Sequence, residues 1–388
     1  MIGWKSIGTL PVATPQIDAD RGAFFENGLA VANRHFAKYT LQTERFRGGL
    51  DRMRSVIHAG GQTTIGDAAF GMYDFEGEWE HLRAVIDRPD TPFRMLLMPF
   101  AAALANTDGP DFLVETIRSF SDRNTHGLRF SDHVKMFSDG GFFAELMMLQ
   151  APGYLDGHNG EWLTVPEQFE AVARTLWNAG LHLHVHCTGD LGVELALSTL
   201  EKLQWQRPRF DHRFTFEHFG ISNAQQVDRI ARVGGLVSAQ VYYVYELSRA
   251  FADNTLGYER ASQMSRMGSV ERAGIPFALH SDFTMAPAKP LNNARIAANR
   301  INESGEVMCP DERATLDGVM RAMTTNAAYI LGMEDEVGSL RAGKKADFAI
   351  LEDDPYDVGV EGLRDIGVWG TVFEGEPFER TSFESSPS

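Results

Sequence analysis

The chain has 388 residues, which is long enough for one large domain and a smaller one. Its formal net charge of −17 argues against a nucleic-acid partner, because no basic patch or stripe is present to meet a phosphate backbone. Two cysteines, Cys187 and Cys309, provide no disulfide framework and fit a reducing compartment. The longest apolar run, 95–105, is too short to span a bilayer. The first residues also lack the pattern of a signal peptide, so we expect a cytoplasmic protein without a membrane partner.

From residue 60 onward, short β-rich runs alternate with segments of helical periodicity. The runs that predict strands are 62–68, 92–100, the second half of 127–140, 181–189, 213–220, 234–241 and 276–283. Helices are predicted at 165–180, 190–205, 223–235 and 311–333. Repeated alternation of this kind is typical of parallel βαβ units.

The spacing of the strand ends favours a barrel over an open, doubly wound sheet. His186 and His218 are 32 residues apart, which is one βα unit, and His218 and Asp282 are 64 apart, which is two. No glycine-rich phosphate loop supports the open sheet. We therefore predict an α/β fold, a TIM-like (β/α) barrel over residues 1–335, whose catalytic groups collect at the C-terminal ends of the strands.

The last part of the chain changes character. Segments 338–357 and 367–379 have the pattern of short strands and turns instead of βα units. We predict a small all-β portion over 336–380, followed by a disordered tail at 381–388.

The stretch LHLHVHCTGD, residues 181–190, places three histidines on alternate positions. Successive side chains of a strand point to opposite faces, so His182, His184 and His186 share one face, about 7 Å apart from one to the next. The stretch alone fits two interpretations. One is a polar strand face with hydrogen-bonded core imidazoles, and the other is a metal site where the chain turns at Gly189.

Four predicted strand ends carry residues that can bind a metal: Lys135 and Asp139, His184 and His186, Glu217 and His218, and His280 and Asp282. Imidazole and carboxylate groups suit zinc and similar divalent ions. A bound cation lowers the pKa of water towards ~7, and a carboxylate beside it can accept the proton. Asp282 closes the last strand and is the natural base. The joint occurrence of these residues at βα spacing favours a metal site.

Several of these residues have a different expected role. Glu217 falls on the opposite strand face from His218, and we predict a structural role for it. His280 shares a face with Asp282 but lies deeper, behind the ligands or in the substrate pocket. His184 lies behind His186 as a supporting residue or a spare ligand. His182 belongs to the barrel interior. Taken singly, Lys135 also fits an ordinary salt-bridge lysine and His218 a packed core histidine.

A resemblance to a known family appears at these residues. The order of VKMFSDG, HVHCTGD, FEHFG and LHSDFT, followed by TTNAAYILGMEDEVGSLRAGKKADFAILEDDP, resembles the amidohydrolase superfamily. More narrowly, it looks like the amidohydrolase-3, YtcJ-like group of metal-dependent hydrolases. The resemblance covers about residues 60–380 and is most specific in GSLRAGKKADFAIL.

The resemblance implies a distorted (β/α)8 barrel, with the C-terminal part of a β-sandwich over 336–380. By position, it implies that Lys135, His186, His218 and Asp282 are metal ligands, that Lys135 can be carbamylated, and that Asp282 is the general base. The implied cofactor is a divalent metal, with zinc the first choice. The implied reaction is hydrolysis of a non-peptide carbon–nitrogen bond in a small molecule, such as an amide or N-substituted formamide.

One family motif is missing from the sequence. The family's first strand carries a His-x-His pair, whereas the upstream histidines His35 and His58 are isolated in helix-like segments. Seven barrel strands are predicted, the first of which corresponds to the family's second. Three explanations fit, in this order: a fragment or misassigned start codon, a degenerate non-catalytic relative, and a variant with a mononuclear site. The alternative to a hydrolase is therefore a binding or assembly protein, for instance a homo-oligomer joined through the open barrel edge.

Overall fold

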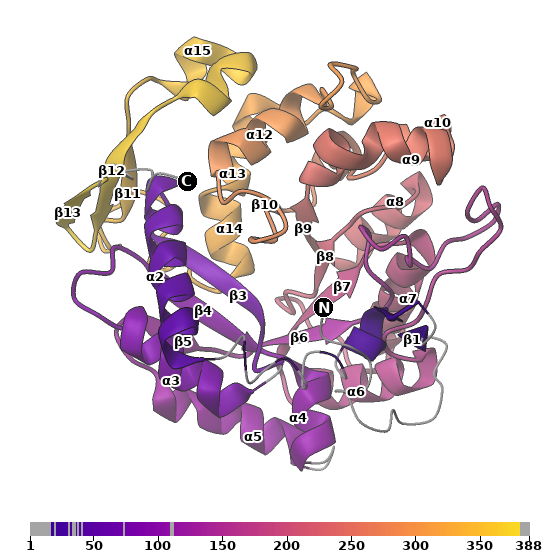
Figure 1. Ribbon diagram of the computed structural model, residues 1–388, viewed down its shortest axis with the longest axis horizontal. Helices are drawn as coiled ribbons and strands as arrows, with labels where there is room; N and C mark the ends of the chain where they lie inside the picture. Colours follow the sequence, from indigo (N-terminus) through magenta and orange to yellow (C-terminus); the bar gives the residue numbers. More distant parts are fainter. Residues whose placement is uncertain are drawn as a thin grey trace.

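The computed structural model describes residues 17–380, apart from 19–20, 30–31, 33–35, 37–38, 40–41, 73 and 109–111. His35 and the tail 381–388 therefore lie outside the described residues. Within them, helices surround a central set of strands, and a small sheet lies at one side (Figure 1). In this part of the chain no helix combines the length and the apolar character that crossing a membrane requires.

Eight parallel strands form the centre of the described part of the chain. They make a three-stranded sheet of order β3-β4-β5 and a five-stranded sheet of order β10-β9-β8-β7-β6. Their bounds are β3 (Thr64–Phe70), β4 (Arg94–Pro99), β5 (Leu128–Phe130), β6 (His133–Phe137), β7 (His182–Cys187), β8 (Thr215–His218), β9 (Leu236–Gln240) and β10 (Phe277–His280). A bridge between Phe100 and Lys135 joins the sheets. In the described residues β3 and β10 do not pair, so the barrel is open between them.

The predicted barrel strands are all present. The run 127–140 contains two strands, β5 and β6, because the chain leaves the extended ladder at residues 131 and 132. The barrel strands alternate along the chain with helices α3 (Phe75–Val85), α4 (Ala101–Asp108), α5 (Leu113–Ser119), η3 (Phe120–Arg123), α6 (Pro166–Asn178), α7 (Asp190–Gln206), α8 (Ala224–Val233), η4 (Tyr243–Leu247), α9 (Ser248–Asn254), α10 (Tyr258–Ser262), α11 (Met267–Arg272) and α12 (Pro290–Asn299).

The predicted helices at 165–180, 190–205 and 223–235 correspond to α6, α7 and α8. Helix α8 shows why the sequence signal was clear. The side chain of Asn223 accepts a hydrogen bond from the backbone of Gln226, whose side chain accepts one from the backbone of Asn223. Gly234 then ends the helix in the left-handed conformation, with φ 72°.

The prediction of one helix over 311–333 is wrong. The segment contains η5 (Pro310–Glu312), α13 (Leu316–Ala322) and α14 (Thr325–Ile330). The break lies at Thr324, whose φ of −126° and ψ of −94° are outside the helical range. A β-branched residue has low helix propensity, and here two threonines are adjacent.

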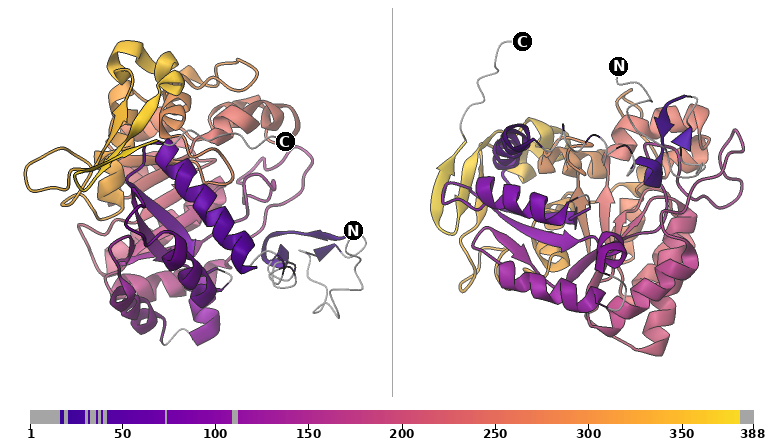
Figure 2. Two further views of the ribbon diagram at one scale, coloured as in Figure 1. Left: turned by 60° about the vertical axis from the view of Figure 1, so that its left-hand side comes forward. Right: turned by 60° about the horizontal axis from the view of Figure 1, so that its bottom comes forward.

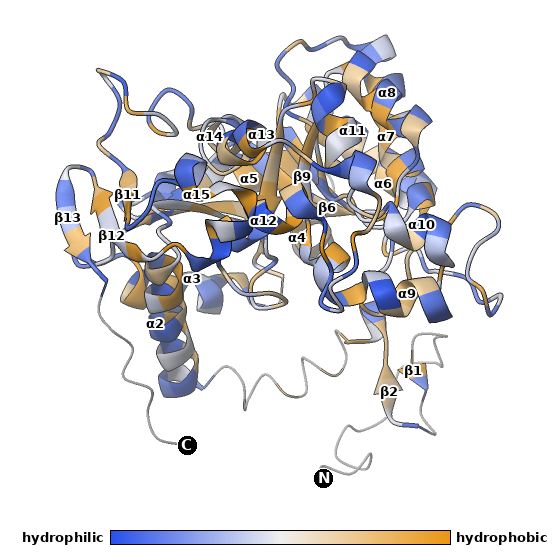
Figure 3. Cartoon of the chain, turned by 90° about the horizontal axis from the view of Figure 1, so that it is seen from above, coloured by the Kyte–Doolittle hydropathy of each residue, from blue (hydrophilic) through white to orange (hydrophobic). Residues whose placement is uncertain are grey.

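The strands of the five-stranded sheet carry apolar residues on their outer face and polar residues on their inner face. In β7, Leu183 and Val185 are fully buried in the main hydrophobic core, whereas the three histidines alternate with them. Figure 3 shows hydrophobic residues along the inner strands and a mixture of hydrophilic and hydrophobic residues along the outer helices. The period-two pattern that predicted β7 therefore also determines which side chains enter the barrel.

A second, antiparallel sheet follows the barrel, with order β11-β12-β13. It contains β11 (Phe348–Leu351), β12 (Val368–Phe373) and β13 (Glu376–Glu379), with α15 (Pro355–Gly362) and η6 (Leu363–Asp365) between the first two. Helix α2 (Thr43–Ala59) lies beside this sheet (Figures 1 and 2), and Nε2 of His58 is 3.1 Å from the carbonyl oxygen of Phe378. Near the start of the described chain are β1 (Ile17–Asp18), β2 (Ala23–Phe24) and η2 (Glu26–Gly28).

Candidate metal centre

The predicted site residues lie at the C-terminal ends of neighbouring barrel strands. The β6–β7 register pairs Phe137 with His186, and the β7–β8 register pairs Cys187 with His218. Strand β10 ends at His280, and Asp282 follows it. Because the strands are parallel, their last residues meet at one end of the barrel.

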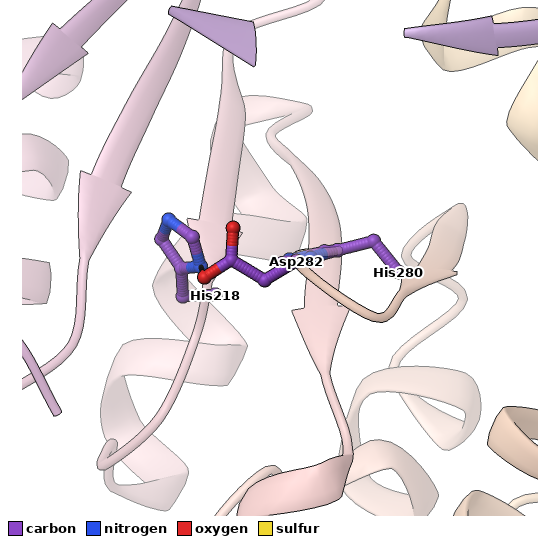
Figure 4. A group of neighbouring side chains, drawn as sticks. All are labelled: His218, His280 and Asp282. Carbon is purple, nitrogen blue, oxygen red and sulfur yellow. Dashed lines mark ion pairs between the residues drawn. The ribbon is translucent and has the colours of Figure 1, made fainter. Parts of the chain in front are cut away.

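Three side chains form a group that can hold a metal ion. One ligand atom from each of His218, His280 and Asp282 lies within 4.8 Å of the other two (Figure 4). Nδ1 of His218 is 3.9 Å from Oδ2 of Asp282. The side chain of Asp282 is 41 % exposed, so solvent reaches its carboxylate, whereas His218 is buried.

Two further predicted ligands adjoin this group. The ring of His186 lies 4.6 Å from the ring of His218, centroid to centroid. Lys135 is buried, with 2 % exposure, and its charge contributes, after burial, to lowering the pKa of both histidines. The structure thus brings Lys135, His186, His218 and Asp282 to the same end of the barrel, and their role as metal ligands stays a prediction.

Three imidazole nitrogens in the cluster are buried and have no hydrogen-bond partner among the described residues: His186 Nε2, His218 Nδ1 and His280 Nε2. The ring of His186 also interacts with the backbone of Gly140, and that of His280 with the backbone of Ser238. A metal-bound histidine commonly donates its second ring N–H to a backbone carbonyl in this way. The donor set therefore fits a divalent metal ion.

Burial keeps these imidazoles uncharged. It lowers the pKa of His186 to about 3 and the pKa of His218 well below its ordinary range, and it also lowers the pKa of His280. Neutral imidazole is the form that binds metal, because the ligating nitrogen must offer its lone pair. The cluster is thus ready for a cation at neutral pH.

The structure corrects the expectation for Glu217, which lies in the cluster instead of on the opposite face. His218 adopts φ 67°, in the left-handed region, so the strand alternation fails at its last residue and both side chains enter the barrel. Asp282 has φ 50°, which likewise turns its side chain after β10 has ended. Such strained backbone is characteristic of functional sites.

Glu217 joins two histidines of the site. Its Oε1 accepts a hydrogen bond from Nδ1 of His184 at 2.6 Å, and its Oε2 is 3.9 Å from Nε2 of His280. Burial acts to raise the pKa of Glu217, but the charge of Lys135 and the hydrogen bond from His184 outweigh it and lower the pKa to about 2. Glu217 is therefore a carboxylate at every pH at which the protein would work.

The remaining predicted residues divide into two groups. His280, expected behind the ligands, contributes a nitrogen to the cluster itself. His184 does lie behind it, fully buried between Glu217 and His133. His182 is deeper in the barrel, where its Nδ1 is 3.0 Å from the carbonyl oxygen of His212.

Asp139, which the sequence offered as metal-competent, is occupied by hydrogen bonds. Its carboxylate accepts from the backbone N–H groups of Met148, Thr188 and Gly189 and from the hydroxyl of Ser138. A Cβ atom at Gly189 would lie 2.1 Å from the carbonyl oxygen of Met148, so only glycine fits there. Asp139 therefore holds the loops after β6 and β7 together.

Sequence reasoning missed His133 and misplaced Glu217. His133 shares a strand face with Lys135, two residues away in β6, so the alternation that identified the β7 histidines also places His133 inside the barrel. No sequence signal marks the left-handed conformation of His218, because such a conformation is rare for residues other than glycine.

Aromatic residues cover one side of the cluster. The ring of Tyr243, at the start of the π-helix η4, stacks on that of Phe142, with 3.8 Å between the centroids and 5° between the planes. Burial raises the pKa of Tyr243 well above its usual range, and the nearby charges of Asp282 and Asp139 add to this. The loop after β6 and the segment after β9 thus meet beside the candidate ligands.

Comparison with known proteins shows to which family the chain belongs. A family model described as "Amidohydrolase family" matches residues 25–378. The chain belongs to the amidohydrolase family. This bears out the resemblance found in the motifs from Lys135 to Asp282.

Two curated relatives are similar to this amidohydrolase. It is 28 % identical over 203 residues to an N-substituted formamide deformylase of Arthrobacter pascens, covering 52 % of this chain and 37 % of the relative. It is 24 % identical over 247 residues to the putative amidohydrolase YtcJ of Bacillus subtilis, covering 63 % of this chain and 46 % of the relative. The matches thus span less than half the length of these relatives.

Solved structures show the same fold. An uncharacterised metal-dependent hydrolase from Pyrococcus horikoshii superposes with a TM-score of 0.71 at 19 % identity, covering 92 % of this chain and 69 % of the other. Atrazine chlorohydrolase TrzN from Arthrobacter aurescens, complexed with zinc, gives a TM-score of 0.59 at 16 % identity, covering 96 % and 81 %. The amidohydrolase barrel predicted from the sequence is confirmed by these neighbours.

Proposed function

We propose that this amidohydrolase is a metal-dependent hydrolase of non-peptide carbon–nitrogen bonds, acting on a small molecule such as an amide or an N-substituted formamide. The observation that supports it most strongly is the set of three imidazole nitrogens that find no hydrogen-bond partner within the described ranges and lie beside a solvent-reachable carboxylate. Burying polar atoms without partners costs free energy, so such a cluster is expected where a ligand completes it. The family and the formamide deformylase relative support the bond type.

His186, His218 and Asp282 would hold the divalent ion, with Lys135 as a further ligand and His280 within reach of the same ion. Zinc is the first choice, since nitrogen and carboxylate ligands suit it and a structural neighbour carries it. When bound, such an ion supplies Lewis-acid chemistry, which acidifies a water molecule and polarises a substrate carbonyl.

The chain's own residues would handle the proton and the substrate. Asp282, the most exposed carboxylate of the cluster, accepts the proton of the attacking water and returns it to the leaving nitrogen. Glu217 stays ionised and balances the charge of Lys135. Phe142 and Tyr243 form an apolar wall that keeps bulk water from this side of the site. The cytoplasmic location inferred from composition stays a prediction.

The experiment compares metal-stripped protein with protein reloaded with Zn²⁺ or Mn²⁺. Metal content is measured first, and hydrolysis of a panel of amides and N-substituted formamides second. His218→Asn removes one ligand. His212→Asn is its matched control, because His212 is also a buried histidine and its ring bonds to the backbone of Phe214 and Val233.

We expect about one equivalent of bound metal, activity that disappears on stripping and returns on reloading, and loss of both in His218→Asn alone. Folded protein that binds no metal and hydrolyses nothing would contradict the proposal and favour the non-catalytic alternative. Equal loss in His212→Asn would show that the effect is a general one on the barrel.

A further inference from the structure

A column of hydrogen-bonded side chains crosses the barrel interior beneath the group of His218, His280 and Asp282. Nδ1 of His133 is 2.7 Å from Nε2 of His184, and Nδ1 of His184 is 2.6 Å from Oε1 of Glu217. All three residues are buried, with exposures of 2 %, 0 % and 6 %. The column comes from three adjacent strands, β6, β7 and β8.

The strand register explains why the column rises towards the cluster. His184 pairs with Lys135, two residues beyond His133 along β6, and Glu217 pairs with His186, two residues beyond His184 along β7. Each step therefore moves one strand sideways and two residues towards the C-terminal end. This oblique path is the stagger that a barrel sheet requires, and it ends where Oε2 of Glu217 faces Nε2 of His280.

Both ring nitrogens of His184 are occupied, one by His133 and one by Glu217. If the ring turned over, these buried groups would lose their partners, at a cost of about 1–3 kcal/mol for each. The ring is therefore locked, and it fixes Oε1 of Glu217 in turn. Only Oε2 remains to face the cluster, at a position that His133 determines from the other end of the column.

We propose that His133 is a positioning residue of the metal centre, which acts through His184 to fix the carboxylate of Glu217 beside the candidate ligands. The inference rests on the proposed function, because it concerns the same metal site. It assigns no proton transfer to His133. Its role is to keep the negative charge of Oε2 close to the candidate ligands, where it attracts a cation, and partners around a metal site raise its affinity.

The test uses substitutions at His133 in the full chain, with the Zn²⁺ dissociation constant measured by competition with a chelator. His133→Phe keeps the ring volume but cannot form the hydrogen bond. His133→Asn places an amide nitrogen near the position of Nδ1 and can restore the bond to His184. His212→Phe is the matched control, because His212 is equally buried and outside the column.

We expect His133→Phe to weaken Zn²⁺ binding by about 10–100-fold, the usual effect of losing a partner behind a metal ligand. His133→Asn should bind within about 3-fold of wild type, and His212→Phe likewise. A Co²⁺-loaded sample should show a changed visible spectrum in His133→Phe alone, because the ligand arrangement around the ion differs. A loss of thermal stability by itself would not produce that change.

If His133→Phe does not fold, His133→Gln takes its place, because its amide lies one carbon farther out than in His133→Asn and misses the bond. Equal affinities in wild type and all His133 variants would overturn this inference and leave the proposed function standing. Equal weakening in His212→Phe would also overturn it. Wild-type protein that binds no Zn²⁺ would overturn both.

Discussion

The inner faces of the two barrel sheets have opposite chemistry. In the five-stranded sheet, the inner positions carry Lys135, His184, Glu217 and His280, which are charged or polar and largely buried. In the three-stranded sheet, Leu96 and Met98 of β4 instead pack against a small hydrophobic cluster from α14 and the turn after it, namely Ala328, Leu331, Met333 and Val337. One half of the barrel is thus a polar chamber, and the other is an ordinary core.

We expect the polar half of the barrel to serve metal binding and the apolar half to stabilise the fold. Polar groups inside a protein cost free energy unless they are paired, and three imidazole nitrogens of the five-stranded half have no hydrogen-bond partner in the part of the chain that the structure describes. The three-stranded half gains free energy from apolar burial. Substitutions in the first half should therefore change metal binding and turnover, whereas those in the second should change the free energy of unfolding.

The largest expected effect is on turnover. Asp282→Asn should lower kcat by about 10²–10⁴-fold, because it removes the proposed general base and one proposed metal ligand. Stability should change little, since the side chain is 41 % exposed. The measurement is kcat of metal-loaded protein on the best substrate of the amide panel, with metal content checked for each sample.

Asp67→Asn in β3 is the matched control for this prediction. Burial and the charge of Glu78 raise the pKa of Asp67 to about 7, so the neutral amide differs little from the native side chain there. Its kcat should equal that of wild type. Full activity in Asp282→Asn, or comparable loss in Asp67→Asn, would contradict the division between the two halves.

Part of the candidate site around Asp282 could be predicted from the sequence. Strand alternation and βα spacing were enough to place Lys135, His186, His218 and Asp282 at one barrel end, because parallel strands bring their ends together. They failed for Glu217, because the left-handed backbone of His218 cannot be read from a pattern of side chains.

The fold shows the same limit. The helices with caps and glycine stops, such as α8, were predictable from local sequence, whereas the break at Thr324 between α13 and α14 was not. This break is where α14 begins, and α14 packs on β4 through Ala328. Tertiary packing thus outweighs helical periodicity at this point.

The next largest effect is on stability. Arg94, 1 % exposed at the start of β4, forms ion pairs with Asp347 and Glu374 and so connects the barrel to the β11–β13 sheet. Arg94→Met would leave the buried carboxylate of Asp347 unpaired, and we expect a loss of about 3–5 kcal/mol in the free energy of unfolding. Urea unfolding measures it, and metal affinity of the folded protein should not change.

Arg123→Met is the control for Arg94→Met. Arg123 is also paired, with Glu76, but that carboxylate is 70 % exposed, so we expect at most about 1 kcal/mol. Similar losses in the two variants would show that burial does not set the strength of these ion pairs.

Truncation in the apolar half gives a smaller loss. Met98→Ala would leave a cavity against Ala328 and its neighbours, and we expect a cost of about 2–4 kcal/mol. The Zn²⁺ dissociation constant should stay at the wild-type value, because Met98 packs in the apolar cluster of the three-stranded half. A weakening of metal binding beyond about 3-fold would show that the two halves are coupled.

The smallest effect depends on pH. Burial acts to raise the pKa of Glu374, but hydrogen bonds from Lys345 and Arg94 outweigh it and lower the pKa to about 2 from its ordinary 4.5. The folded state therefore binds fewer protons, and this stabilisation is present above pH 4.5 and lost as the pH falls from 4.5 towards 2.

Glu374→Gln should accordingly lower the free energy of unfolding at neutral pH by about 1–3 kcal/mol. On acidification, the free energy of unfolding should fall less in this variant than in the wild type. Urea unfolding of both proteins at pH values above and within this window provides the comparison. Parallel pH profiles for wild type and Glu374→Gln would show that the carboxylate is not stabilised by its partners.

The central claim is that a divalent ion binds where β6, β7, β8 and β10 end, and anomalous X-ray diffraction at the zinc absorption edge tests it most directly. Crystals of the metal-loaded protein should give one strong anomalous peak about 2.0–2.2 Å from a nitrogen of His218 and an oxygen of Asp282. The absence of a peak there, in crystals that hold zinc elsewhere or not at all, would contradict the account.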